Sequence, residues 1–215
     1  MKKISSVKFE EILKKKYLSH FHTTYSDGAS TVAEYFKFAA KQGVGILIFM
    51  EHVRREMAYE FDSFVRDIEG AKKIYPGVGS VIGVEAKILP GGELDIPEEI
   101  LDKIQLIGFA CHSFPDDVDL YQRSFERLFS EKRWKPYIRV WVHPGRFFKG
   151  EALSGQNKDV LKEVMDCASQ NGVFIEKNLR SGNPMLKVNS VCSTQKVITG
   201  YDAHSVEEIA ETYSV

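Results

Sequence analysis

Seven short apolar runs, rich in β-branched and aromatic residues, recur along the 215-residue chain, and segments of helical length separate most of them. We predict strands over residues 17–22, 44–52, 80–88, 104–112, 138–143, 173–178 and 196–202. Strands that alternate with helices pair mainly in parallel, because each crossover helix returns the chain to the same end of the sheet. The alternation therefore predicts an α/β fold.

The segments between these strands carry helix signals. Ser30 or Thr31 can cap a helix that ends before Gly43, and Gly172 suits the end of a helix over 157–171. Further helices are expected over 59–74, 116–132 and 205–213, with a first helical turn at 97–99. We expect an extra N-terminal helix within residues 1–16, whose core-facing side would carry Val7, Phe9, Ile12 and Leu13.

Composition limits the class of protein. Hydrophobic residues make up 43% and charged residues 27% of the chain, as in ordinary globular proteins. No linker or repeat interrupts the alternation, so we expect residues 1–215 to form a single domain. The 29 basic residues balance 30 acidic ones, which excludes a global field that would attract nucleic acid or an anionic membrane.

The cysteines and the hydropathy pattern bear on location. Cys111, Cys167 and Cys192 are odd in number and form no CxxC pair, which argues against a disulfide framework and against a cysteine zinc site. No apolar stretch approaches the ~18 residues of a membrane span, and residues 1–16 do not have the pattern of a signal peptide. We expect a cytoplasmic protein with no membrane partner.

All six histidines occur at or just past the carboxyl end of a predicted strand. They are His20, His22, His52, His112, His143 and His204. In a closed parallel barrel these strand ends share one rim, where residues far apart in sequence assemble a site. The placement therefore favours a barrel over an open sheet.

Carboxylates accompany these histidines. His20 and His22 lie two residues apart and should face the same side of their strand, while Asp27, Glu85 and Asp202 occupy matching positions. A single histidine at a strand end is usually a hydrogen-bonded structural residue. The joint pattern instead predicts a metal site, because imidazole nitrogens with carboxylate oxygens suit zinc, manganese or iron.

The order of these motifs along the chain is specific. The pieces are His20-Phe21-His22 with Ser26-Asp27-Gly28, Glu51-His52, Gly83-Val84-Glu85, His112-Ser113, His143-Pro144, Glu176-Lys177-Asn178 and Asp202-Ala203-His204. In this order they resemble the PHP family, the polymerase and histidinol phosphatase superfamily, over essentially the whole chain. Residues 83–95 are most similar to the branch that holds small stand-alone phosphatases and the PHP domains of bacterial X-type polymerases. The resemblance implies a distorted (β/α)7 TIM-like barrel with a trinuclear metal site.

The resemblance also implies a ligand set for three divalent ions, which would be zinc, manganese or iron. The first would be held by His20, His22, Glu85 and Asp202, the second by Asp27, His52 and His204, and the third by Glu85, His112 and His143. Glu85 would bridge two ions, since a carboxylate has two oxygens. The same nine residues would be catalytic through the bound metals.

Two positions depart from the family pattern. Glu51 stands where the family usually has aspartate, and we expect it behind the ligands as an outer partner. Lys177 replaces an apolar residue, and strand alternation should point it away from Glu176 and Asn178.

The chemistry that follows is phosphoester hydrolysis. A water held between two cations loses a proton near neutral pH, and the resulting hydroxide would be the nucleophile. Three arginines follow strand ends and would bind the substrate phosphate: Arg54, Arg146 and Arg180. The alternative for each is a solvated side chain that pairs with a surface acid, and the sequence favours neither. Aromatic residues also flank the ligands, and core packing is the default for each: Phe21, Tyr25, Phe114, Phe147, Phe148 and Tyr201.

We expect a phosphomonoesterase acting on a small phosphorylated metabolite, such as histidinol phosphate or a nucleotide. Two alternatives remain open. A phosphodiesterase or nuclease would use the same metals, with nucleic acid as a substrate only. An inactive, metal-stabilised interaction module would keep the ligands without turnover.

Overall fold

All seven predicted strands are present in the computed structural model, which describes residues 2–148, 155–180 and 196–213. Two of them are interrupted briefly, so that 44–52 appears as two strands and 80–88 as two more. The strands are β1 (Tyr17–Ser19), β2 (Ile46–Ile48), β3 (Glu51–Val53), β4 (Gly79–Val81), β5 (Gly83–Ile88), β7 (Leu106–Ala110), β8 (Ile138–Trp141), β9 (Phe174–Asn178) and β10 (Val197–Gly200). Cys192 lies outside the described residues.

These strands pair in parallel in the order of the chain. One sheet has the strand order β1-β2-β4, and the other has the order β3-β5-β7-β8-β9-β10. The two interrupted strands link the sheets, because β2 continues into β3 and β4 continues into β5. The ring closes between the last strand and the first, because the Tyr201 amide donates to the Ser19 carbonyl at 3.0 Å and the His22 amide donates to Ala203 at 2.8 Å. Among the described strand pairs, only β6 (Leu94–Asp95) runs antiparallel to its partner, β5. The fold is a distorted (β/α)7 TIM-like barrel.

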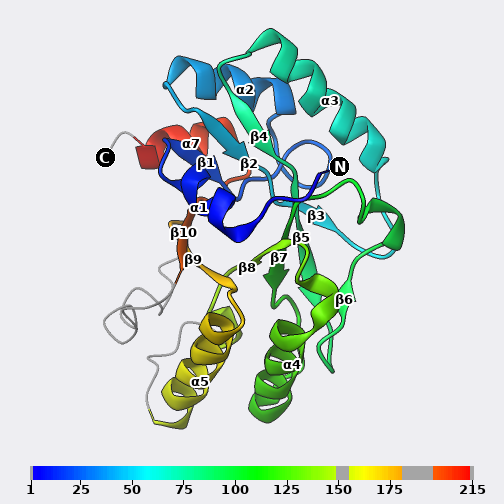
Figure 1. Cartoon of the computed structure of the whole chain (residues 1–215), viewed down its shortest axis with the longest axis vertical. Coiled ribbons are helices and arrows are strands. Elements are labelled where there is room, and N and C mark those ends of the chain that lie inside the picture. The colour runs from blue at the N-terminus through cyan, green and yellow to red at the C-terminus, as the bar shows by residue number, and fades with distance from the viewer. Residues whose placement is uncertain (1, 149–154, 181–195, 214–215) are drawn as a thin grey trace.

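The helices lie around the barrel wall, apart from α1, which packs against the interior at one end of the barrel (Figure 1). They are α1 (Ser6–Leu13), α2 (Val32–Lys41), α3 (Phe61–Ile74), α4 (Val118–Ser130), α5 (Gln156–Gln170) and α7 (Val206–Tyr213), with 3-10 turns at Glu98–Ile100, Lys132–Trp134 and Arg146–Phe148. Thr31 caps α2 in a capping box with Glu34. Gly43 and Gly172 adopt positive φ angles of 65° and 67° after α2 and α5, as the sequence predicts.

The apolar residues form two layers. The larger layer lies between the strands and the outer helices, while a smaller one fills the barrel interior with residues such as Met50, Leu106 and Val140. Phe9 of α1 is fully buried in this inner layer, and its ring meets Phe174 edge-on at 5.2 Å. The helix α1 therefore closes the amino-terminal mouth of the barrel.

The predicted apolar face of α1 is wrong at one position. Val7 is 71% exposed, whereas Ile12 and Leu13 pack partly against the inner layer with Phe9. An α-helix turns by about 100° per residue, so two positions along the chain correspond to about 200°. Val7 and Phe9 therefore lie on opposite sides of the helix. A pattern of apolar residues alone did not separate them.

A buried arginine ties two outer helices to the barrel wall. Arg139 of β8 is only 7% exposed, and its guanidinium donates to the carbonyl of Phe129 in the last turn of α4 at 2.8 Å and to the carbonyl of Asn171, the C-cap of α5. These carbonyls lie at the negative ends of two helices, which compensate the buried charge.

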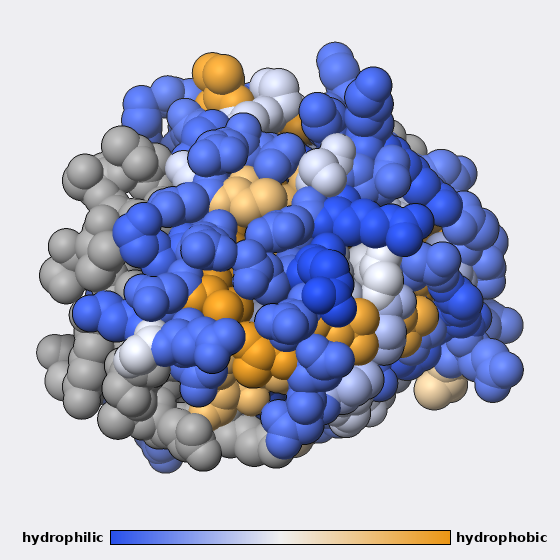
Figure 2. Space-filling view, turned by 90° about the horizontal axis from the view of Figure 1, so that it is seen from below, coloured by the Kyte–Doolittle hydropathy of each residue, from blue (hydrophilic) through white to orange (hydrophobic). Residues whose placement is uncertain are grey.

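Figure 2 shows the face of the molecule that lies at the bottom of Figure 1. This face is mainly hydrophilic, and a few apolar patches are exposed between the hydrophilic residues. Within the described ranges, no helix combines the length and apolar character that a bilayer span requires.

Candidate metal centre

The nine predicted ligands lie at one end of the barrel. His52 and Glu85 lie within β3 and β5, Asp27 lies in the loop between β1 and α2, and the other six follow the carboxyl end of a parallel strand. Residues from β1, β3, β5, β7, β8 and β10 therefore meet around a common centre, although they span positions 20 to 204. This convergence is the one that the strand-end pattern predicts.

Glu85 of β5 is the middle of this centre and is fully buried. Its Oε1 lies 2.9 Å from Nε2 of His112 and 3.1 Å from Nε2 of His143. Its Oε2 lies 2.9 Å from Nδ1 of His52 and 3.6 Å from Nε2 of His20. The two carboxylate oxygens thus face different imidazole groups, which is the arrangement that a bridging ligand needs.

A second carboxylate faces the paired histidines. Oδ1 of Asp202 lies 3.5 Å from Nε2 of His22 and 3.8 Å from Nε2 of His20, while Oε2 of Glu85 lies 3.7 Å from Nε2 of His22. These four residues, expected around one ion, therefore bring their donor atoms together.

Asp27 collects a third group at the outer side. Its Oδ2 lies 3.5 Å from Nε2 of His52 and 3.4 Å from Nε2 of His204, and the rings of His22 and His52 stack at 4.1 Å. Asp27, His52 and His204 are more exposed than Glu85 and the His20–His22 pair. This group therefore lies nearer to solvent.

The Glu176–Asn178 motif lies directly behind the histidines. The buried carboxylate of Glu176 contacts Nδ1 of His20 and accepts the backbone N–H of His143 at 3.0 Å. The side-chain amide of Asn178 contacts Nδ1 of His143 at 3.0 Å and Glu176 at 3.1 Å. Both residues orient imidazoles, a role that the motif alone did not reveal, while Lys177 points outward as predicted.

Glu51 supports the other histidine, as expected for an outer partner. Its Oε1 lies 3.9 Å from Nδ1 of His22 and accepts from Ser26, and its Oε2 accepts from the amide of Thr23 at 3.0 Å. The Thr23 hydroxyl donates to the same oxygen at 2.5 Å. The longer glutamate side chain thus links the His22 ring to the loop that carries Asp27.

The backbone is unusual at three of the clustered residues. His20, His143 and Asp202 have positive φ angles of 56°, 47° and 50°, and Ser113 beside His112 has 51°. Residues other than glycine rarely adopt this left-handed region, and each costs about 1 kcal/mol or more. The strands therefore turn sharply where the predicted ligands leave them.

The charges in the centre are tightly coupled. Burial opposes ionisation of Glu85, yet hydrogen bonds from the surrounding imidazoles hold its pKa well below the ordinary value. Burial lowers the pKa of His22 to about 4. Burial would also lower the pKa of His52, but the contacts with Glu85 and Asp27 outweigh it and raise that pKa.

The donor set fits divalent metal ions. Nε2 of His20, both ring nitrogens of His22, Nδ1 of His52 and Oε2 of Glu85 are buried and make no hydrogen bond with the described residues. Such orphaned polar atoms are costly, because buried donors and acceptors normally have partners. Within 4.8 Å of one another, these atoms form groups of three that could each hold a cation, for example His20 with His22 and Glu85.

The three predicted phosphate-binding arginines lie in different settings. Arg180 donates to the carbonyl of Asp202 at 2.9 Å and contacts the His204 ring, so it borders the centre. Arg146 lines a cavity beside His112. Arg54 instead donates to the carbonyl of Val53 at 2.6 Å and lies 4.0 Å from Asp95, which directs it toward the barrel flank.

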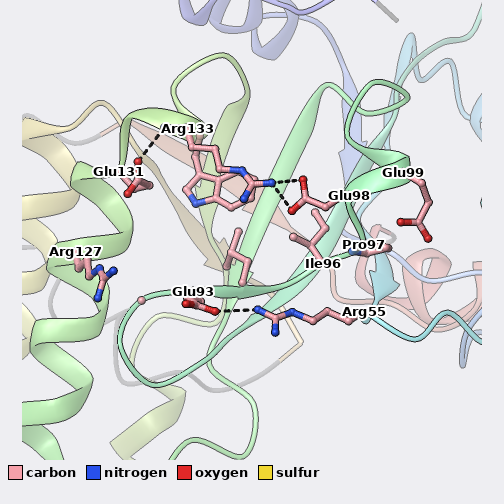
Figure 3. Close-up of a pocket in the computed structure, with 12 residues that line it drawn as sticks. Arg55, Glu93, Ile96, Pro97, Glu98, Glu99, Arg127, Glu131 and Arg133 are labelled. Carbon is pink, nitrogen blue, oxygen red and sulfur yellow. Dashed lines mark hydrogen bonds and ion pairs between the residues drawn. The ribbon is translucent and has the colours of Figure 1, made fainter.

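Another cavity, of about 510 Å³, lies on that flank beside α4. Figure 3 shows its walls, where Arg55 pairs with Glu93 at 2.9 Å and Arg133 pairs with Glu98. Among the described residues that line it there is no histidine or cysteine. Its walls carry carboxylate and guanidinium groups, two pairs of which contact each other.

Comparison with known proteins places this barrel. The chain is 22% identical over 207 residues to the DNA polymerase/3'-5' exonuclease PolX of Bacillus subtilis, which covers 87% of this chain and 34% of that protein. It is 26% identical over 166 residues to a probable phosphatase of Thermoanaerobacter sp. strain X514, which covers 74% of this chain and 63% of that protein. The chain thus spans about one third of the length of PolX and less than two thirds of the length of the probable phosphatase.

A solved structure shares the fold. The histidinol phosphate phosphatase of Lactococcus lactis, complexed with zinc, L-histidinol and phosphate, superposes with a TM-score of 0.65 and 14% identity, covering 93% of this chain and 92% of that one. The family model of the PHP domain matches residues 19–180, a range that begins just before His20 and ends at Arg180. The sequence motifs, the barrel and this match agree, and the chain belongs to the PHP domain family.

Proposed function

We propose that this protein is a metal-dependent phosphoesterase that hydrolyses phosphomonoesters of small metabolites, with histidinol phosphate and nucleotides as the first substrates to test. One observation carries the proposal: the two oxygens of buried Glu85 face separate imidazole groups, and on the Oε2 side the buried nitrogens His20 Nε2 and His52 Nδ1 make no hydrogen bond with the described residues. The likeness to a probable phosphatase and to a zinc-bound histidinol phosphate phosphatase supports it.

We propose the nine clustered residues as ligands of three ions, zinc, manganese or iron, in the three groups given by their family motifs. When bound, such cations supply Lewis acidity and a nucleophile derived from water at neutral pH. The chain itself orients the imidazoles through Glu176, Asn178 and Glu51. Arg146 and Arg180, next to the cluster, would neutralise the phosphoryl oxygens of the substrate.

The test measures phosphate release from a chromogenic monoester by protein supplied with manganese or zinc. His143→Ala and Asp202→Asn should each reduce turnover at least 100-fold while the protein stays folded, because each removes a proposed ligand. Lys177→Ala, on the outward face of the same strand as Glu176, serves as the matched control. Unchanged turnover in both ligand variants would refute the proposed site.

A phosphodiester is assayed as the second substrate. The chain is similar to PolX, whose name includes a 3'-5' exonuclease, and this likeness favours diester hydrolysis as the alternative activity. Faster cleavage of the diester than of the monoester would replace the monoesterase proposal. Metal binding without cleavage of either ester would instead support an interaction module.

A further inference from the structure

The main chain of His204, in the loop after β10, is held from both sides. Its backbone N–H donates to Oε2 of Glu208 in α7 at 2.8 Å, and its carbonyl accepts the backbone N–H of Ala29 at 2.6 Å. Nε2 of the ring lies 3.4 Å from Oδ2 of Asp27. These contacts fix His204 at the outer metal position, by which we mean the group of Asp27, His52 and His204 proposed for the second ion.

The other ring nitrogen of His204 contacts an arginine. Nη1 of Arg180 contacts Nδ1 of His204 and also donates to the carbonyl of Asp202 at 2.9 Å. Nη2 of the same guanidinium lies 3.8 Å from Oε1 of Glu208, which favours this placement of the cation. Arg180 therefore binds both the His204 ring and the backbone carbonyl next to it.

This contact decides which nitrogen of the neutral ring carries the proton. A guanidinium has donors only, so Nδ1 of His204 accepts from Arg180. In a neutral imidazole one nitrogen accepts and the other donates, so the proton lies on Nε2, which faces Asp27. A metal ion needs the lone pair of that same nitrogen. The contact with Arg180 and an ion on Nε2 therefore exclude each other.

The chain also provides a second partner for Nδ1. The carbonyl of Asp202 lies 3.2 Å from Nδ1 of His204, so it can accept an Nδ1–H once Arg180 has left. Histidines that bind metals usually donate their second ring N–H to a carbonyl or carboxylate in this way. The released guanidinium keeps its charge at the edge of the cluster, where a phosphoryl group can accept two of its N–H groups.

We propose that Arg180 competes with the outer ion for His204, and that binding of this ion releases the guanidinium to the substrate phosphate. This inference rests on the proposed function, because it concerns how the same site is assembled. The exchange moves one proton within the ring from Nε2 to Nδ1 and itself releases none. Binding of the outer ion and binding of a phosphoryl group therefore favour each other.

The first measurement is zinc affinity, by calorimetric titration of the full metal-free chain. Arg180→Met should strengthen the weakest zinc affinity about tenfold, because the ion no longer displaces a hydrogen bond from a charged donor. Arg146→Met removes a cation beside His112 and controls for the loss of charge alone, so the same affinity should change by less than about threefold. Thermal unfolding verifies that both variants fold. Unchanged or weaker zinc affinity in Arg180→Met, or an equal gain in both variants, would overturn the exchange.

The second measurement locates the ring proton of His204. Proton–nitrogen NMR spectra of the imidazoles are recorded at about pH 8, where an ordinary histidine is neutral, and His204→Gln identifies the signals of this ring. Without metal, the wild-type ring should carry its proton on Nε2, and Arg180→Met should carry it on Nδ1, next to the Asp202 carbonyl. A wild-type ring with its proton on Nδ1 would refute the competition.

The third measurement tests the release to phosphate, with methylphosphonate as a phosphoryl group that cannot be hydrolysed. It should raise the weakest zinc affinity of the wild type about tenfold more than that of Arg180→Met. An equal gain in both proteins would refute the release.

Hydrolysis is assayed separately, so that the two proposals can fail independently. If the ring proton and the zinc affinity respond as expected but neither a monoester nor a diester is cleaved, the phosphoesterase is refuted and the competition by Arg180 stands. If esters are cleaved while the ring proton and the zinc affinity are the same in Arg180→Met as in the wild type, the competition alone is refuted.

Discussion

Gly200→Ala tests how the outer partners hold the metal centre. Gly200 lies in β10 beside Asn178 of β9, and a Cβ placed on it would lie 1.9 Å from Oε1 of Glu176 and 2.6 Å from its Cδ. Real Cβ contacts are essentially never closer than 3.0 Å, so the buried carboxylate must move. It would then leave His20 and the backbone N–H of His143.

The cost follows from these contacts. Overpacking a well-packed site costs about 1–3 kcal/mol, and a displaced hydrogen bond to a charged group costs about 1.5–3 kcal/mol. We therefore expect Gly200→Ala to lower the free energy of unfolding by about 3–5 kcal/mol. Because Glu176 orients two imidazoles, zinc affinity should also fall by about 10- to 100-fold.

Urea unfolding of the metal-free protein measures the first quantity, and competition with a zinc chelator measures the second. Gly70→Ala is the control, because Gly70 lies within α3 with no atom within 4 Å of its added Cβ. That change should stabilise the protein by about 0.5–1 kcal/mol. Wild-type stability and zinc affinity in Gly200→Ala would show that Glu176 does not occupy the position described.

The remaining predictions concern packing, capping and pH. Arg139→Met should lower the free energy of unfolding by about 2–4 kcal/mol in urea, because two helix ends lose a charged donor, whereas exposed Arg123→Met should change it by less than about 0.5 kcal/mol. Phe9→Ala should cost about 3–5 kcal/mol by opening the barrel mouth, and an equal effect of Val7→Ala would contradict that account. Zinc affinity should rise with pH up to the raised pKa of His52, because below that pKa the zinc ion must displace a proton from the imidazole. Calorimetry at pH 6.5 in two buffers of different ionisation enthalpy should detect the released proton. Zinc binding without proton release would argue against this linkage.

Local patterns in the sequence were sufficient for the strands and for the candidate ligands. Apolar runs of strand length and helix caps such as Thr31 depend on neighbours within a few residues, so they are legible without a structure. The histidines and acids at strand ends could be located for the same reason, and parallel barrel geometry brings such ends to one rim. Their role as metal ligands stays a prediction.

Long-range packing decided the rest. The separate orientation of the two Glu85 oxygens, the left-handed backbone at His20, His143 and Asp202, and the clearance that Gly200 gives Glu176 all depend on strand register. The closing contact between Phe21 and Ala203, like the cavity between two loops beside His112, joins segments distant in sequence. No local period records such contacts, because they arise only when the whole ring of strands closes and each side chain meets neighbours from other strands.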